Sequence, residues 1–442
     1  MPGAVAERVS SESSSKAAAL QRWLVHQALL ATPIPRVAGH FVDSLVDMGM
    51  PVWRAFLATS TLHPQVEGVG LTWTRDGQRL RQEYQHGSFE RLPSLSPMYD
   101  AVVATQARPS ADSGAMDSII TPMTRYRLDR GEGTATYAIL EEFRAGGATD
   151  YLCFAIPFAN DGNVDEGNAG AVITVMVDRP GGFTDDEIVT IADLMPALGA
   201  ALRASTDLAA IRTALDTYLG RDVGRRVLNG EIKRGSVAAI SAAILVGDLR
   251  GFTVLADEVP RDRLVSMLDD YLDCLVSPVE ASGGQVLKFL GDGLLATFAF
   301  DAQEPRTMCA AALMAATEAL RRIDALNRIR RKDGQPVTTL DLALHAGDVL
   351  YGNVGSARRL DFTIIGPAVN ESARLEALCA TLDVPLVASR RFVDLLGASE
   401  KFRSLGPRVL RGVRAPVEVF TLVTGEQARA EPVNAEVGAH DV

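Results

Sequence analysis

The spacing of apolar and polar residues divides the chain into two folded regions. In the first, residues 151–158 and 169–178 are apolar runs, and the second run is rich in β-branched residues, as buried strands are. Apolar residues at near-helical spacing predict a short helix over 16–31, behind a disordered lead at the serine-rich residues 10–15. We therefore expect a mixed α/β region that starts near residue 35.

A long helix is expected to close this first region. Thr184 and Glu187 have the spacing of a capping box, and the helix that they open is predicted to run through 185–219. Apolar residues in its later half have the spacing of a two-stranded coil. A helix packed on its own domain has the same pattern, and the stretch has too few turns to decide. These apolar residues are Leu208, Ile211, Leu215 and Tyr218.

The second region alternates strand and helix patterns. Leu340, Leu342 and Leu344 alternate with Asp341, Ala343 and His345, which predicts a strand with one covered face. In order, we expect a strand at 240–248, a helix at 260–281, a hairpin at 284–299 turning at Asp292–Gly293, a helix at 306–328, and a hairpin made of 340–347 and 348–355. This order contains the βαββαβ plan of ferredoxin-like folds, so the predicted fold class is α/β (α+β).

Composition narrows the kind of protein. A length of 442 residues predicts two to four domains, and a net charge of −11 argues against a nucleic-acid partner. The four cysteines are scattered, which indicates buried thiols in a reducing compartment. The sequence contains neither an uninterrupted run of eighteen apolar residues nor a signal pattern, so we expect no membrane span and a cytoplasmic protein.

Two carboxylates stand at the ends of apolar runs. Asp248 follows AAILVG, and Asp292 follows QVLKFLG. Mg²⁺ binds to one or two carboxylates together with substrate phosphates, and two close metals can act on both the attacking and leaving oxygens. Alternatively, Asp248 caps a helix that begins near Gly251, and Asp292 belongs to an Asp–Gly turn. Taken together, the pair favours an enzyme that acts on nucleoside triphosphates.

Three further side chains are candidates for the same chemistry. Lys288 lies between apolar neighbours on a strand and must find a partner or reach solvent, as a surface lysine with a buried stem does. Asn370 and Arg374 share one face of a helix that opens at Gly366–Pro367, where Arg374 could bind phosphate or simply face solvent. His345 is interpreted as a hydrogen-bonded sheet residue. The sequence has no P-loop motif.

Five blocks of the second region resemble, in order and with matched spacing, the catalytic domain of class III nucleotidyl cyclases. They are VGDLRGFT (246–253), GGQVLKFLGDGLLATF (283–298), LALHAGDVLYGNVG (342–355), RLDFTIIGPAVNESARLE (359–376) and VLRGVRAPVEVFTL (409–422). The resemblance covers about residues 237–423.

The resemblance implies a role for each matching residue. Asp248 and Asp292, with the carbonyl of Leu249, would hold two Mg²⁺ or Mn²⁺ ions, and Lys288 with Thr363 would select adenine over guanine. Asn370 would orient the ribose and Arg374 would stabilise the transition state. The remaining matches, to substrate-binding positions, are Arg358, Arg411, Phe252 and Thr253.

The implied activity is conversion of ATP to 3′,5′-cyclic AMP and pyrophosphate. Cyclases of this kind work as head-to-tail dimers with sites shared between chains, so a homodimer is expected. A guanylyl cyclase and a non-catalytic nucleotide-binding signalling module are the alternatives. The Lys–Thr pair resembles the subgroup that includes bicarbonate-responsive cyclases, which permits that sensitivity.

Residues 171–204 resemble the closing strand and helix of GAF sensor domains. A regulatory domain that binds an unknown small molecule or ion is therefore expected, and a purely structural dimerisation domain is the alternative. The expected divisions are a disordered lead and helix at 1–34, a GAF-like domain at 35–204, a helical linker at 205–236, a cyclase domain at 237–423 and a flexible tail at 424–442.

Overall fold

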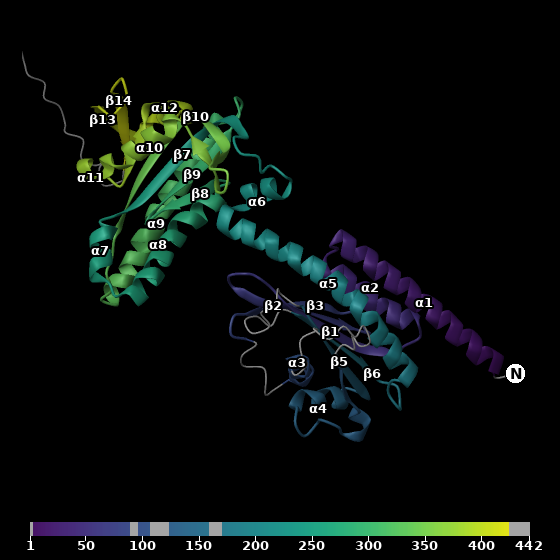
Figure 1. Cartoon of the computed structure of the whole chain (residues 1–442). Helices are drawn as coiled ribbons and strands as arrows, with labels where there is room; N and C mark the ends of the chain where they lie inside the picture. Colours follow the sequence, from purple (N-terminus) through teal and green to yellow (C-terminus); the bar gives the residue numbers. More distant parts are fainter. Residues whose placement is uncertain (1–2, 89–95, 107–122, 159–169, 424–442) are drawn as a thin grey trace, which may run out of the picture. The chain divides into compact units, whose positions relative to one another are not determined.

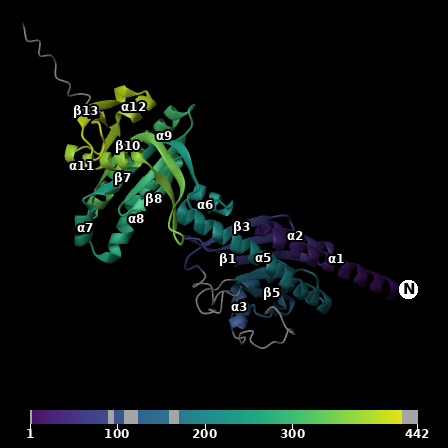
Figure 2. The same ribbon diagram turned by 45° about the horizontal axis from the view of Figure 1, so that its top comes forward.

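The computed structural model describes residues 3–88, 96–106, 123–158 and 170–423 (Figures 1 and 2). It divides into two compact units, Met1–Ala214 and Leu215–Val442. The predicted flexible tail lies outside the described residues. Each unit has its own sheet and its own hydrophobic core.

The N-terminal unit is an antiparallel sheet covered on both faces. Its elements are α1 (Gly3–Leu30), α2 (Ile34–Asp47), β1 (Val52–Ser60), β2 (Val66–Thr74), β3 (Arg79–Gln85), α3 (Met98–Gln106), β4 (Met123–Tyr126), a 3₁₀ turn (Leu128–Arg130), α4 (Ala138–Ala145), β5 (Asp150–Pro157), β6 (Gly170–Val177) and α5 (Asp185–Leu219). The strand order is β3-β2-β1-β6-β5-β4. Successive residues of β5 point to opposite faces. Leu152 and Phe154 pack with α1, α2 and α5, while Tyr151 and Cys153 pack with α3 and α4.

The structure confirms the start of the long helix and corrects the N-terminal lead. Thr184 donates its backbone N–H to Glu187 Oε2 at 2.8 Å, and Glu187 returns one to Thr184 Oγ1 at 3.3 Å. This reciprocal pair is the predicted capping box. Residues 10–15 lie within α1 rather than in a disordered lead.

Helix α5 is the one described element with the length and apolar composition of a membrane span. Half of its most apolar 18-residue stretch is buried within the protein. Ile191, Leu194 and Leu198 of this helix join the core of the N-terminal unit. Core helices often pass the same test, so this feature is weak evidence for a span.

A buried carboxylate ties the start of β5 to the loop before α5. Asp150 is fully buried and accepts a hydrogen bond from Arg125 Nη2 at 2.7 Å and from the Phe183 N–H at 3.0 Å. Gly182 lies so close that a Cβ there would be 2.3 Å from Asp150 Oδ2. The charge is therefore paired and hydrogen-bonded, which a buried carboxylate requires.

We predict that Asp150→Ala lowers the free energy of unfolding of the N-terminal unit by about 3 kcal/mol, because it leaves Arg125 without its buried partner. Denaturant titration of the full chain measures the loss. The matched control is Asp207→Ala, which removes an exposed pair with Arg203 (N···O 3.4 Å) and should change stability by less than about 0.5 kcal/mol. Equal effects of the two substitutions would contradict the prediction.

The C-terminal unit has the predicted ferredoxin-like core with additions. Its elements are α6 (Arg221–Leu228), β7 (Val237–Arg250), α7 (Phe252–Glu258), α8 (Arg261–Ala281), β8 (Gln285–Leu290), β9 (Gly293–Phe300), α9 (Pro305–Lys332), β10 (Thr339–Gly355), β11 (Leu360–Ile365), α10 (Pro367–Glu376), α11 (Leu378–Leu382), β12 (Leu386–Ser389), α12 (Arg390–Leu396), a 3₁₀ turn (Ser399–Lys401), β13 (Phe402–Arg408) and β14 (Val417–Leu422). The sheet order is β13-β14-β12-β10-β7-β9-β8, and β11 pairs with β10 outside this path. Strands β10-β7-β9-β8, with crossover helices α8 and α9, form the βαββαβ unit.

Of two predicted turns, one is absent and the other is shifted by one residue. The hairpin of 340–347 with 348–355 is instead one continuous strand, β10, which pairs with β7 from Thr339 to Gly352. Gly347 is small for packing rather than for turning, because a Cβ there would lie 2.4 Å from the Ala368 side chain. The β8–β9 hairpin turns at Gly291–Asp292, one residue earlier than expected, since Gly291 adopts the left-handed φ of +72°.

Both faces of β10 are buried, so the prediction of one covered face is wrong. Leu342 and Leu344 pack with α8, α9 and α12 in the larger core. On the other face, Ala343 packs with α10 and α11, and Tyr351 packs with α6. Figure 1 shows α8 and α9 side by side along the sheet.

Candidate active site

Strand pairing brings the two predicted aspartates together. Asp248 lies near the end of β7, and Asp292 lies in the turn that leads into β9, the strand paired with β7. Gly293 permits this approach, because a Cβ there would lie 2.6 Å from Asp248 Oδ1 and 2.4 Å from the carbonyl oxygen of Gly247. Asp248 does not cap α7, whose N-cap is Gly251 without a side-chain hydrogen bond.

The aspartates belong to a wider group of acidic side chains. Burial, followed by the charges of Asp292 and Asp341, raises the pKa of Asp248 to about 6. Burial, followed by the charges of Asp248, Asp341 and Asp292, raises the pKa of Glu376 to about 7. The geometry agrees: Asp341 on β10 lies opposite Asp248 in the strand pairing, and Asp292 directly precedes Gly293, where a Cβ would lie 2.6 Å from Asp248 Oδ1.

Asp341 and its partner Arg250 were missed in the sequence. Asp341 lies opposite Asp248 in the β10–β7 pairing and is 4% exposed. Arg250 donates to Asp341 Oδ1 at 2.6 Å and also bonds Asp383 at 3.0 Å. This clamp occupies Asp341, which leaves Asp248, Asp292 and Glu376 as the carboxyl groups of the acidic group without a hydrogen-bond partner among the described residues, and of these three Asp248 and Asp292 lie on or next to the paired strands β7 and β9. The alternation of polar residues along 340–345 was the only signal for Asp341.

The acidic group fits divalent cations that share their coordination with a ligand. Within the described ranges, no three His, Cys, Asp or Glu side chains are arranged around one ion position. Asp248 and Asp292 are two hard oxygen donors whose mutual repulsion a cation would relieve, and the missing Cβ of Gly293 lets them approach each other. Mg²⁺ typically binds to such a pair and completes its shell with phosphate and water. Leu249, whose side chain is buried in the core, remains the predicted carbonyl ligand.

Lys288 has a partner that the sequence did not reveal. Its Nζ lies 2.9 Å from Oδ2 of Asp361 on β11. A register shift in the β8–β9 pairing between Val286 and Lys288 interrupts the simple alternation expected for this strand, and such bulges redirect side chains. Thr363 lies two residues beyond Asp361, and among the described residues its buried hydroxyl finds no hydrogen-bond partner.

Asn370 and Arg374 lie on α10, as predicted. Asn370 is exposed and Arg374 is half-buried. The Arg374 guanidinium lies against the β13–β14 loop, 3.6 Å from where a Cβ on Gly412 would be. The charges that shift the pKa of Asp248 come from Asp292 and Asp341 and not from Arg374.

The remaining predicted residues divide by exposure. Arg358, Arg411 and Thr253 are exposed, whereas Phe252 is 7% exposed and packs in the larger core. Its side chain is therefore unavailable to a ligand. His345 is buried and its Nδ1 lies 2.8 Å from Ser389 Oγ, which confirms the predicted structural role. Burial, followed by the charge of Arg391, lowers the pKa of His345 to about 4.

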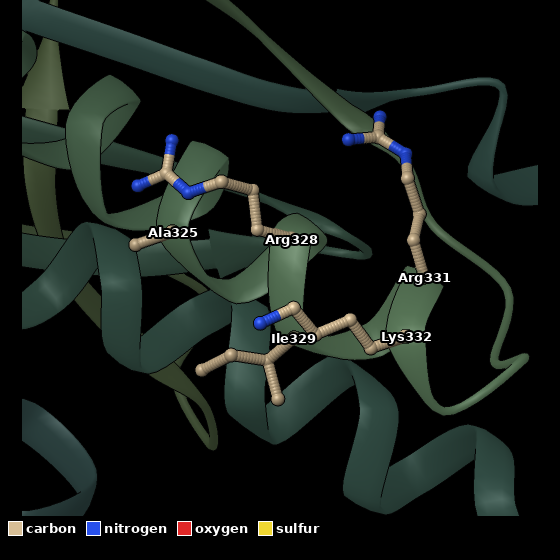
Figure 3. A pocket seen from close by; sticks show the side chains of 5 residues that line it. All are labelled: Ala325, Arg328, Ile329, Arg331 and Lys332. Carbon is tan, nitrogen blue, oxygen red and sulfur yellow. The ribbon is translucent and has the colours of Figure 1, made fainter.

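A hollow of about 460 Å³ on α9 shares no residue with the acidic group. Figure 3 shows its lining residues, which all come from α9 and are Ala325, Arg328, Ile329, Arg331 and Lys332. Without an acidic or nucleophilic side chain, this hollow has none of the groups that the predicted chemistry needs.

Comparison with known proteins agrees with this geometry. Residues 238–424 match the sequence model of the "Adenylate and Guanylate cyclase catalytic domain". An adenylate cyclase of Anabaena cylindrica is 28% identical over 228 residues, which are 49% of this chain and 44% of that protein. Adenylate cyclase 1 of Rhizobium meliloti (strain 1021) is 28% identical over 179 residues, 40% of this chain and 26% of that protein. The chain thus spans less than half the length of either relative.

Among solved structures, the adenylyl cyclase CyaB from P. aeruginosa is 24% identical. The alignment covers 43% of this chain and 97% of that chain, with a TM-score of 0.39. On the family match, the C-terminal unit carries an adenylate and guanylate cyclase catalytic domain.

We predict that Gly293→Ala weakens Mn²⁺ binding at least about tenfold, because the new Cβ would collide with the Gly247 carbonyl and displace Asp248. Paramagnetic resonance of a Mn²⁺ titration measures the affinity. Gly39→Ala is the control, since a Cβ there would meet nothing within 4 Å. An unchanged Mn²⁺ affinity in Gly293→Ala would show that the metal lies elsewhere.

Proposed function

We propose that the protein is an adenylyl cyclase that converts ATP to 3′,5′-cyclic AMP and pyrophosphate. The observation that carries this proposal is that the pairing of β7 with β9 and the close approach of Gly293 bring Asp248 and Asp292 together within the matched catalytic domain. Curated adenylate cyclases among the relatives support the choice of adenine. ATP as substrate would place the catalytic unit in the cytoplasm.

Each residue then has a defined task. Asp248 and Asp292 would hold the divalent cations. When bound, two such cations neutralise the phosphates and acidify the ribose 3′-hydroxyl. Asn370 orients the ribose so that the 3′-oxygen lies in line with the α-phosphorus, and Arg374 donates to the α-phosphate as charge develops. A positioned donor of this kind is typically worth about 3 kcal/mol.

Base selection falls to β8 and β11. Lys288, held by Asp361, presents its ammonium to the ring nitrogens of adenine, and the Thr363 hydroxyl supplies a further hydrogen bond. A buried hydroxyl without a partner costs free energy that a bound base would recover. Together, Lys288 and Thr363 discriminate adenine from guanine, because the wrong base would leave a buried polar group without a hydrogen bond.

A homodimer with shared sites is the proposed assembly. Large apolar side chains are exposed along β8, β10 and β11, and on the later half of α5, where a second chain could cover them. The exposed residues are Phe289 (53%), Leu290 (47%), Leu350 (46%), Ile365 (43%), Ile211 (51%) and Tyr218 (85%). Under this proposal, one chain supplies the aspartates and its partner supplies the base-selecting pair with Asn370 and Arg374.

We further propose that the N-terminal unit is a GAF-like regulatory domain. Its six-stranded antiparallel sheet with helices on both faces is compatible with that class. The ligand that it would bind is not specified by any described cavity.

The purified chain should form cyclic AMP from ATP in the presence of Mn²⁺, and chelation with EDTA should abolish this activity. Asp292→Ala should reduce turnover at least about 10³-fold, because one metal-holding carboxylate is lost. Anion-exchange separation of nucleotides measures both. Faster turnover of GTP to cyclic GMP would identify a guanylyl cyclase, and tight ATP binding without turnover under any metal would favour a signalling module.

Mixing two inactive variants tests the shared site. Asp248→Ala and Arg374→Ala chains should each be inactive, whereas co-expressed chains should regain roughly a quarter of wild-type activity, the share of intact sites in a random mixture. The control is Asp248→Ala mixed with Asp292→Ala, which damages the same half-site twice. Equal activity in the two mixtures would contradict the shared-site proposal.

A further inference from the structure

Helix α6 packs into the catalytic unit although it lies upstream of the matched domain. Val223 is 1% exposed and joins a core of residues from β7, β8, β9, β10 and β11. Gly220, with a φ of +83°, separates α6 from α5 and lets the chain turn. The unit is therefore completed by residues that come from the linker.

A polar network joins α6 to two strands. Asp222 Oδ2 lies 3.0 Å from the Tyr351 hydroxyl, which is also 3.1 Å from Gln285 Oε1 on β8. Arg226 Nε donates to Asp222 Oδ2 at 2.8 Å, and Arg226 Nη1 donates to Glu231 at 3.0 Å. Asp222 on α6 thus contacts Tyr351 of β10 and the arginine of the next helical turn, and the Tyr351 hydroxyl extends the network to Gln285 on β8.

The arginine of this network lies over the aromatic pair that supports β11. Arg226 Cζ is 5.3 Å from the Tyr351 ring centroid and 6.0 Å from the Phe362 centroid. The two rings form an edge-to-face pair with centroids 4.8 Å apart. Contacts of this kind stabilise a fixed arrangement of the partners. Phe362 is therefore held from above by α6 and from the side by β10.

On β11, Phe362 lies between Asp361, the partner of Lys288, and Thr363, the second proposed base-selecting residue. Phe362 and Ile364 point into the core shared with α6, so Asp361 and Thr363 point to the opposite side of β11. Moving Phe362 must therefore move both groups.

The order of the strands explains why the packing of α6 affects both β8 and β11. β8 ends one side of the sheet and β11 pairs with the other edge of β10, yet Lys288 and Asp361 meet at 2.9 Å. The sheet curls so that β8 and β11 come into contact, and α6 packs into the core between them. Asp222 of α6 contacts the Tyr351 hydroxyl, which lies next to Gln285 of β8, and Arg226 of α6 lies over the ring of Phe362 on β11. We infer that Arg226, fixed by Asp222, is a positioning residue that sets the distance between β8 and β11 and thereby the discrimination between ATP and GTP. This inference rests on the proposed function.

The test compares Arg226→Met, Arg226→Lys and Asp222→Asn in the full chain. For Arg226→Met we expect the KM for ATP to rise about tenfold, kcat to change less than about twofold, and the ATP/GTP ratio of kcat/KM to fall about tenfold, with Arg226→Lys between wild type and Arg226→Met. The matched control is Arg322→Met, which removes a similar pair with Glu318 (2.9 Å) on α9 and should behave as wild type.

Hydrogen–deuterium exchange supplies a readout that does not need turnover. Peptides covering 285–290 and 360–365 should exchange at least about threefold faster in Arg226→Met, while the peptide covering 386–389 should not change. Wild-type exchange and an unchanged ATP/GTP ratio would overturn the inference. Faster exchange with an unchanged ratio would also overturn it, because the role would then be structural only.

Failure of the proposed function would look different. If the wild-type chain forms no cyclic nucleotide from ATP or GTP, the cyclase proposal fails. The positioning role is then judged by the ratio of ATP to GTP dissociation constants, which should fall about tenfold in Arg226→Met. An unchanged ratio of dissociation constants would overturn the role of Arg226 independently.

Discussion

Repulsion between carboxylates is the constraint on which the catalytic unit depends. Antiparallel pairing of β7 with β9 and β10 forces Asp248 towards Asp292 and Asp341, and α10 adds Glu376. The surrounding sheet, buried on both faces, provides the free energy that holds these charges together. Gly293 makes the approach possible sterically. Because this unit holds several carboxyl groups close together and pairs only some of them with arginine, divalent cations can bind the others.

The side of the unit for which we propose base selection depends on attraction between charges. There, opposite charges are paired, Lys288 with Asp361, and their geometry depends on a curled sheet and not on adjacent strands. The curl is closed by aromatic stacking and by one buried valine, Val223, from the linker. The position of the acidic group is thus set by backbone pairing, whereas the geometry of the Lys288–Asp361 pair is set by side-chain packing, which is more easily changed.

Local patterns were predictable from the sequence and long-range ones were not. The capping box of Thr184 and Glu187 and the β8–β9 hairpin depend on neighbouring residues, and both were found. The sequence predicts a hairpin of 340–347 with 348–355, but β10 is one continuous strand, and Gly347 at the expected break is small because Ala368 of a later helix packs against it. Asp361 was missed for a related reason. Its partner lies 73 residues away in sequence, on a strand that meets it only after the sheet has curled.

The packing of α6 makes the compact unit start earlier in the chain than the sequence similarity does. The core of the catalytic unit includes Val223. Sequence similarity to the cyclase family begins at residue 238, whereas the compact unit defined by packing begins at Leu215. A fragment that begins at residue 238 would lack α6 and would expose to water the apolar residues that Val223 covers on the curled sheet.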